Sequence, residues 1–432
     1  MATDNRLILS EIGQGVFVFT IILFSFREGL TIITQAAALL LIAAFAYEVM
    51  FKAKSFKFTM PLPLLCFLVF VVYSMLSLIW TNQSVDFSTT LVQLFLISFV
   101  MINIIRHLGQ IRSITYGFLS ALLVASVDML AKMDSMVVTD DNMRISSFLG
   151  NANVFAIALF IGVMLIVDAL FNDRLRSRSA GIRLVANLLL SVLGMLFIYE
   201  VIFLTGSRKA MIALFIFSLL FFFRYLLKAK FLMKIVILAA GAGVFSVLLM
   251  VTKESVFFQR FNKVFDMLLG KSVREGSINE RSSMIFDGLS LWRQHPLLGW
   301  GTDQFRYVSG YQTYSHNNYV ELLSNNGLVG LILYYLMFVF LLAAGISLIR
   351  SGDKTANHYG WLNLTTLAIL IFWDFALVSY YSKLHWVVLS VIMGLTYYVH
   401  ANLKRQRPEQ TGAFESREGA AYGKVKAAAY DS

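Results

Sequence analysis

The stretch LVANLLLSVLGMLFIYEVIFL, residues 184–204, decides the fold class of this chain. Its side chains are mostly apolar, and they lack the alternation of apolar and polar residues that the strands of a membrane barrel require. It has the length of a helix that crosses roughly 30 Å of hydrocarbon at about 1.5 Å per residue. The stretch therefore predicts a transmembrane helix.

Similar apolar stretches recur along the whole chain. The 432 residues are 58% hydrophobic and only 14% charged, which excludes the soluble, disordered and collagen-like classes. We expect an all-α polytopic membrane protein with about twelve transmembrane helices. The expected spans are residues 7–26, 30–50, 61–80, 88–105, 113–131, 151–170, 183–204, 208–226, 232–251, 318–348, 360–380 and 384–402.

The basic residues predict how these helices are oriented. Alternate short loops hold fifteen Lys and Arg, and the intervening loops hold six. Because cytoplasmic loops collect Lys and Arg, the richer set is expected in the cytoplasm, together with both termini. The net charge of +11 then reflects topology and contact with anionic membrane lipids, and no nucleic-acid partner is predicted. The first apolar stretch has no small-residue cleavage site after it and is expected to be retained as a helix.

The chain divides into four parts, one of which is a long segment between the ninth and tenth expected helices. Helices 1–9 are expected in residues 1–251, a large extracytoplasmic (periplasmic) loop in 252–316, helices 10–12 in 317–403 and a cytoplasmic tail in 404–432. The loop is too long to be a passive connection in a compact membrane protein, so function is expected there.

Several kinds of chemistry lack their sequence motifs. The chain has no P-loop, no dinucleotide-binding glycine motif, no zinc-protease motif and no D-x-D pair, so neither a cofactor nor a metal is predicted. The chain has a single cysteine, Cys66, which lies in an apolar stretch. An intrachain disulfide is excluded because it needs two cysteines.

Arginines at loop positions are candidates for binding an anion. Arg208, in Thr205-Gly206-Ser207-Arg208-Lys209-Ala210, lies at a tight external turn, where a guanidinium either pairs with phosphate in two-pronged fashion or anchors the helix at the interface. Arg281, Arg293 and Arg306 add positive charge to the long loop, where solvated charges are also ordinary.

His316 is the candidate proton acceptor. It lies in Ser315-His316-Asn317-Asn318-Tyr319-Val320-Glu321 at the start of the tenth span, and an imidazole titrates near neutrality. A histidine at a helix start is also often a cap. Asn317 is a candidate substrate ligand, and Glu321 is placed to reach an arginine or an acceptor hydroxyl.

Two further candidates lie in the first part of the chain. Asn153 precedes the sixth span, where an amide either caps the helix or bonds a sugar hydroxyl. Glu200 is an acid within an apolar span, about two turns from Arg208, and such acids are functional suspects. Others of this kind are Glu11, Asp168 and Asp374. Asp168 is expected to be interfacial, beside Arg174.

These motifs together resemble one known family. The TGSR turn at Arg208, Gly150-Asn151-Ala152-Asn153, the stretch HPLLGWG at residues 295–301, the stretch from His316 to Leu323, and Gly327-Leu328-Val329-Gly330 look like the O-antigen ligase and O-antigen polymerase superfamily. The hallmark region covers about residues 187–335, and the twelve-span layout extends the resemblance over most of the chain.

The resemblance implies a membrane glycosyltransferase of the bacterial cytoplasmic (inner) membrane. Its donor would be a polyprenyl (undecaprenyl) diphosphate-linked oligosaccharide, and its acceptor another glycan, in a polymerase, or lipid A core, in a ligase. Residues that match those tied to activity in the family are Arg208, Arg281 and His316, with Arg274 and Arg293 as alternatives to Arg281. The resemblance slightly favours a polymerase of O-antigen or capsule, active on the outer face of the membrane.

Two hypotheses from other classes remain open at this point. A lipid or polysaccharide transporter would suit twelve spans with intramembrane acids, although the two halves of the chain show no convincing repeat. A structural membrane scaffold would depend on no single polar residue. The sequence says nothing of the oligomeric state.

Overall fold

The computed structural model describes residues 8–24, 29–52, 56–81, 87–105, 110–131, 152–172, 180–205, 207–228, 230–232, 234–235 and 276–404. Within these ranges the regular secondary structure is helical, with turns and loops between the helices and no strand. The helices are α1 (Ile8–Phe24), α2 (Thr31–Tyr47), α3 (Leu62–Leu76), α4 (Phe87–Ile104), α5 (Ile111–Ala131), α6 (Ala152–Asn172), α7 (Ala180–Tyr199), α8 (Arg208–Lys228), α11 (Gly276–Gln294), the short α12 (Phe305–Val308), α13 (Asn318–Ile349), α14 (Lys354–Asp374) and a final helix, Lys383–Lys404.

Many of these helices have the length and composition of membrane spans. Seven described helices are long and apolar enough to cross a membrane, and three shorter apolar helices accompany them at Ile8–Phe24, Thr89–Ile104 and Lys209–Leu220. The all-helical, polytopic membrane class is therefore confirmed. Most of the expected ninth span, 232–251, and of the loop part 252–275 lies outside the described residues.

The stretch that decided the fold class has one face directed away from the protein. Along α7 the side chains of Leu184, Leu188, Val192 and Met195 are exposed, at spacings of three and four residues. This is the period of one face of a helix. An exposed apolar face of this kind is what lipid contact requires.

Close helix crossings hold the bundle together. α1 packs on α2 and α5, and α13 packs on α3 and α14. At the α1–α5 crossing, a Cβ on Gly117 would lie 2.1 Å from the carbonyl oxygen of Gly15, so only glycine permits this approach. In the core, the ring of Phe67 in α3 stacks on Trp386 of the final helix, with 3.5 Å between ring centroids.

α14 differs from the predicted span 360–380. It begins earlier, because the Asp353 side chain caps it by accepting from the Ala356 N–H at 2.7 Å, and it ends at Asp374. The following residues, 375–382, form a turn in which the side chains of Val378 and Tyr380 are buried in protein. Asp374 accepts hydrogen bonds from Tyr335, Ser379 and Asn318. Asp168 pairs with His358 of α14 at 2.7 Å.

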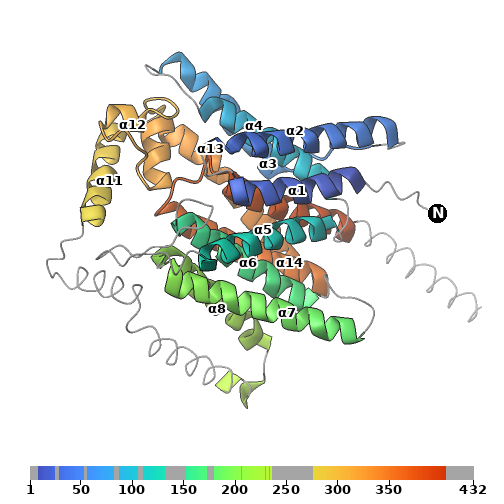
Figure 1. Cartoon of the computed structure of the whole chain (residues 1–432). Coiled ribbons are helices and arrows are strands. Elements are labelled where there is room, and N and C mark those ends of the chain that lie inside the picture. The colour runs from blue at the N-terminus through green and yellow to red at the C-terminus, as the bar shows by residue number, and fades with distance from the viewer. Residues whose placement is uncertain are drawn as a thin grey trace, which may run out of the picture.

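α11 and α12 lie at one end of the helical bundle (Figure 1), next to the first turns of α13. The turn HPLLGWG connects α11 to α12. These elements bring most of the sequence motifs to that end of the bundle.

Candidate functional site

A break in α13 creates the platform of the site. Gly327 has φ 64° and ψ −168°, a conformation that is essentially restricted to glycine. At this break the chain pairs with the HPLLGWG turn through four backbone hydrogen bonds: Trp300 N–H to Ser324 O (2.9 Å), Gly301 N–H to Asn325 O (2.7 Å), Leu328 N–H to Pro296 O (2.9 Å) and Val329 N–H to Leu297 O (3.2 Å). The two glycine-containing motifs are therefore one structural unit.

The end of α3 fixes this unit to the bundle. The Tyr73 hydroxyl lies 3.2 Å from the carbonyl oxygen of Leu298 and 2.8 Å from that of Asn326. Ser77 and Thr302 share a hydroxyl–hydroxyl hydrogen bond of 2.9 Å. The turn is thus held from both sides, by α13 and by α3.

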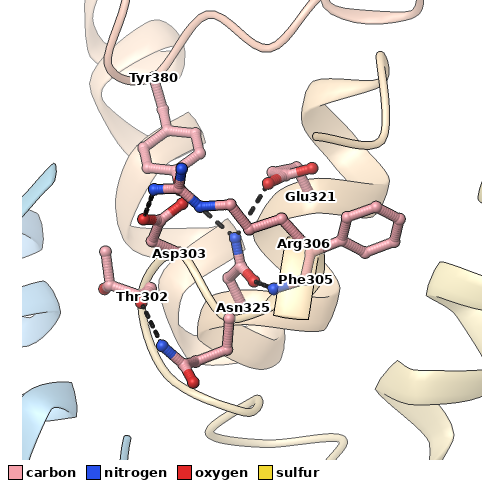
Figure 2. Close-up of polar contacts among 8 residues, drawn as sticks. Thr302, Asp303, Phe305, Arg306, Glu321, Asn325 and Tyr380 are labelled. Atoms are coloured by element: carbon pink, nitrogen blue, oxygen red, sulfur yellow. Dashed lines mark hydrogen bonds and ion pairs between the residues drawn. The ribbon is translucent and has the colours of Figure 1, made fainter. Parts of the chain in front are cut away.

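A cluster of polar side chains, formed by Asp303, Arg306, Glu321 and Asn325, lies next to this break. Figure 2 shows the Arg306 guanidinium between the Asp303 carboxylate and the Tyr380 ring, and Arg306 and Asp303 form an ion pair. Burial acts to lower the pKa of Arg306, but the contact with Asp303 more than offsets it and the pKa is raised. Arg306 therefore stays charged, with its charge neutralised locally by Asp303.

Asn325 connects the cluster to the helix that follows His316. Its amide oxygen accepts the Phe305 N–H at 2.6 Å, and its amide nitrogen lies 3.2 Å from Glu321 Oε1 and 3.4 Å from the Tyr380 hydroxyl (Figure 2). Asn325 and Glu321 are both essentially inaccessible to solvent, with exposed fractions of 0% and 2%. Burial of this network demands that its polar groups be paired, and these contacts provide the partners.

Glu321 positions the turn that carries His316. Its Oε2 accepts the Ser315 N–H at 2.7 Å, and the Ser315 hydroxyl donates to the Asn317 carbonyl at 2.9 Å. His316 has φ 58°, in the left-handed region that is uncommon for residues other than glycine. The Tyr314 ring lies against the imidazole, with 4.4 Å between centroids.

The surroundings of His316 keep its imidazole neutral. Burial, then the positive charges of Arg281 and Lys209, lower the pKa of His316 to about 4. Arg281 comes from α11 and Lys209 from the start of α8, so the structure brings together residues from three distant parts of the sequence. A neutral imidazole at physiological pH can accept a proton, and the two cations beside it favour an anion.

The segment after α14 joins the starts of α8 and α13. The Asn317 side chain caps α13 by accepting from the Val320 N–H at 3.1 Å, and it donates to the Phe375 carbonyl at 3.3 Å. Lys209 donates to the next carbonyl, that of Ala376. Asn317 is therefore occupied with backbone contacts that fix the position of His316.

The turn before α8 also contacts the start of α6. The Ser207 hydroxyl lies 3.2 Å from the amide oxygen of Asn153. The structure thus joins the two motifs that contain Asn153 and Arg208. Arg208 is the first residue of α8, and its side chain lies outside the described part of the chain, as do Asn151 and Arg274.

Two candidates lie apart from His316. Glu200, in a π-helical turn at Glu200–Leu204, is fully buried and accepts from the Ser126 hydroxyl of α5 at 2.7 Å. Arg293 is exposed in the last turn of α11, twelve residues from Arg281, which corresponds to about 18 Å along a helix. The structure brings neither side chain into contact with His316.

Sequence reasoning missed Lys209 and the 375–382 segment. In the sequence, Lys209 stands out only as part of the charge bias of a loop. The segment reads as the end of a span because Phe375, Leu377 and Val378 are apolar. Within the described residues, no three His, Cys, Asp or Glu side chains gather in a way that would hold a metal ion.

Taken together, the fold and the site define a multi-pass helical membrane protein with a cationic site around a neutral histidine. Residues 193–335 match the family model described as O-antigen ligase. This range includes α8, Arg281 and His316, and it confirms the resemblance to the O-antigen ligase and polymerase superfamily. A comparison with curated proteins found no match. The family match and the apolar helices indicate a multi-pass protein of the bacterial inner membrane. Members of the matched family are glycosyltransferase-like enzymes of O-antigen assembly.

Proposed function

We propose that this protein is an inverting glycosyltransferase that moves a glycan from a polyprenyl diphosphate to an acceptor hydroxyl, without a metal ion. The observation that carries the proposal is the neutral imidazole of His316 beside the charges of Arg281 and Lys209, within the O-antigen ligase region. The site would face the extracytoplasmic side, as the distribution of Lys and Arg predicts, with both termini in the cytoplasm.

In the proposed reaction His316 acts as the base, and the cations stabilise the leaving group. The oxygen of the acceptor hydroxyl attacks the anomeric carbon of the donor sugar, and the bond from that carbon to the diphosphate oxygen breaks. The electron pair leaves with the polyprenyl diphosphate, while the hydroxyl proton passes to His316. One displacement at the anomeric carbon inverts its configuration.

Arg208 and Arg281 would stabilise the leaving group. Cleavage leaves extra negative charge on the diphosphate, and fixed guanidinium groups that meet it in the transition state lower the barrier. Glu321 and Asn317 act differently, because they hold the Ser315–Asn317 backbone and so position His316. Asn153, Glu200 and Arg293 remain proposals as substrate-binding residues.

The acceptor defines two versions of this activity. We favour a polymerase, whose acceptor is another lipid-linked glycan, because the stretch from Ser315 to Leu323 resembles polymerases most closely. The alternative is a ligase with lipid A core as acceptor, which the description of the matched family favours.

The test uses purified protein in lipid nanodiscs with undecaprenyl-diphosphate oligosaccharide, a chelator present and no nucleotide. Wild type is compared with Arg208→Ala, Arg281→Ala and His316→Ala. Arg350→Ala and Lys354→Gln are matched controls, since Arg350 follows α13 at the opposite end of that helix and Lys354 is exposed in the first turn of α14. We expect transfer by wild type and controls and a loss of at least about 100-fold in the three variants.

The products distinguish the acceptors. A ladder of glycan lengths without added core would support the polymerase, and transfer only with lipid A core would support the ligase. Full activity of His316→Ala would refute the proposed mechanism. In sealed proteoliposomes, movement of the lipid-linked glycan across the bilayer without any transfer would favour the transporter.

A further inference from the structure

Lys209 is held in a fixed position next to His316. It is the second residue of α8, and its ammonium group donates a hydrogen bond to the Ala376 carbonyl. The preceding carbonyl, that of Phe375, accepts from the Asn317 side chain at 3.3 Å. Two consecutive carbonyls therefore hold Lys209 and the residue that follows His316, which brings the ammonium group close to the imidazole.

The charged groups around His316 come from several elements. Arg281 of α11 and Lys209 of α8 act on it as positive charges, and Tyr314 packs on its ring. The nearby carboxylates have other partners: Asp303 pairs with Arg306, and Glu321 accepts from Ser315 and Asn325. Two cations beside a neutral ring, with these acids engaged elsewhere, form an arrangement that a bound anion would stabilise.

Building on the proposed function, we propose that Lys209 binds the diphosphate of the lipid-linked donor together with Arg281. An ammonium carries three N–H donors, so a bond to Ala376 is compatible with a second bond to a phosphate oxygen. The bond to Ala376 orders the flexible lysine stem before the donor arrives, which reduces the entropy lost on binding.

This arrangement links donor binding to the base. Burial, and after it the charges of Arg281 and Lys209, disfavour a proton on His316. A bound diphosphate would neutralise these charges and remove their part of the lowering, so the pKa of His316 would be higher with the donor than without it. A base with a pKa nearer the working pH is the more effective one. Lys209 would thus make proton transfer depend on the presence of the donor.

The experiment compares Lys209→Gln and Lys209→Arg with wild type in the nanodisc transfer assay. The matched control is Lys354→Gln, because Lys354 is an exposed lysine in the first turn of α14. Glutamine retains a donor for Ala376 but lacks the charge, while arginine retains both. We expect Lys209→Gln to raise the donor KM about 10- to 100-fold and Lys209→Arg to change it by less than about 5-fold.

The pH profile gives a second readout, which a purely structural role would not move. In wild type the acid limb of kcat/KM, which reports the free enzyme, should lie at about pH 4, and that of kcat at higher pH. In Lys209→Gln the kcat/KM limb should move to higher pH, because one of the charges that lower the pKa of His316 is gone. Lys209→Met serves as the second uncharged variant if Lys209→Gln does not fold.

Three outcomes would overturn the inference, and they can be told apart. If His316→Ala and Arg281→Ala abolish transfer while Lys209→Gln keeps the wild-type KM and pH profile, only the role of Lys209 is wrong. If Lys209→Gln and Lys209→Arg are equally impaired with an unchanged pH profile, Lys209 is a structural tether. If His316→Ala transfers glycan normally, the proposed function itself fails.

Discussion

The pairing of the HPLLGWG turn with the break in α13 makes a quantitative prediction for Gly327→Ala. A Cβ at this position would lie 2.2 Å from the Leu297 carbonyl oxygen and 2.7 Å from the Gly299 nitrogen. Both distances are far below van der Waals contact, and both neighbours are backbone atoms that cannot rotate away. The turn must therefore move, or α13 must change its conformation.

Two contributions make up the free-energy cost of Gly327→Ala. An alanine at φ 64° and ψ −168° costs about 1–3 kcal/mol for the backbone conformation alone. Undocking of the turn loses four backbone hydrogen bonds, each with a net contribution of about 1 kcal/mol. The docked turn should therefore be destabilised by at least about 2 kcal/mol, which corresponds to roughly 30-fold in the equilibrium between docked and undocked forms.

Hydrogen exchange measured by mass spectrometry tests this prediction directly. The amides to follow are the four donors, Trp300, Gly301, Leu328 and Val329. We expect their exchange to accelerate at least about 30-fold in Gly327→Ala, with a matching loss of transfer activity. Gly310→Ala is the matched control. Gly310 also has a positive φ, 78°, but a Cβ added there would meet no atom within 4 Å. Wild-type protection of these four amides in Gly327→Ala would refute the reasoning.

Three further predictions concern single carboxylates and one imidazole. Glu321→Gln should lower kcat with little change in donor KM. The glutamine oxygen can accept the Ser315 N–H, but its amide nitrogen then faces the Asn325 amide nitrogen, and both are donors. Steady-state kinetics with an unchanged kcat would show that Glu321 has no positioning role. The stability of the folded state should decrease as pH falls from 6.5 to about 4, because the unfolded chain protonates His316 first. Thermal unfolding in nanodiscs should show a steeper fall with pH in this window for wild type than for His316→Gln, and parallel curves would contradict the prediction. Glu48→Gln should lower the free energy of unfolding by about 1–3 kcal/mol. The reason is that Glu48 caps α1 by accepting from the Leu9 and Ser10 N–H groups at 2.8 and 3.0 Å. An unchanged midpoint of thermal unfolding would rule this out.

The fold class was predictable because one physical signal dominates it. The apolar run at residues 184–204 is long enough to cross a bilayer, and its exposed face in α7 agrees with a position against lipid. Hydropathy failed at residues 375–382, where the side chains of Val378 and Tyr380 are buried in protein. Composition alone does not distinguish a side chain that faces lipid from one that packs under a polar site.

Parts of the site were predictable and others were not. His316 and Arg281 were chosen from the sequence, and the structure brings them together. The docking of Trp300 and Gly301 on α13 uses backbone groups, which leave no side-chain pattern beyond the glycines themselves. Lys209 was missed because its function depends on a contact with Ala376, 167 residues away in the chain.

The low pKa of His316 bears on the order of donor binding and proton transfer. A base with a pKa of about 4 is a weak one at neutral pH, which would be a poor choice if the free protein had to perform the proton transfer. The lowering arises from burial and from Arg281 and Lys209, and a bound diphosphate would neutralise the two cations. The same charges that contribute to the low pKa of His316 would therefore bind the donor that raises it. A site of this kind would suppress proton uptake by His316 until the donor has arrived, and the acceptor would then meet a base whose strength already depends on the donor.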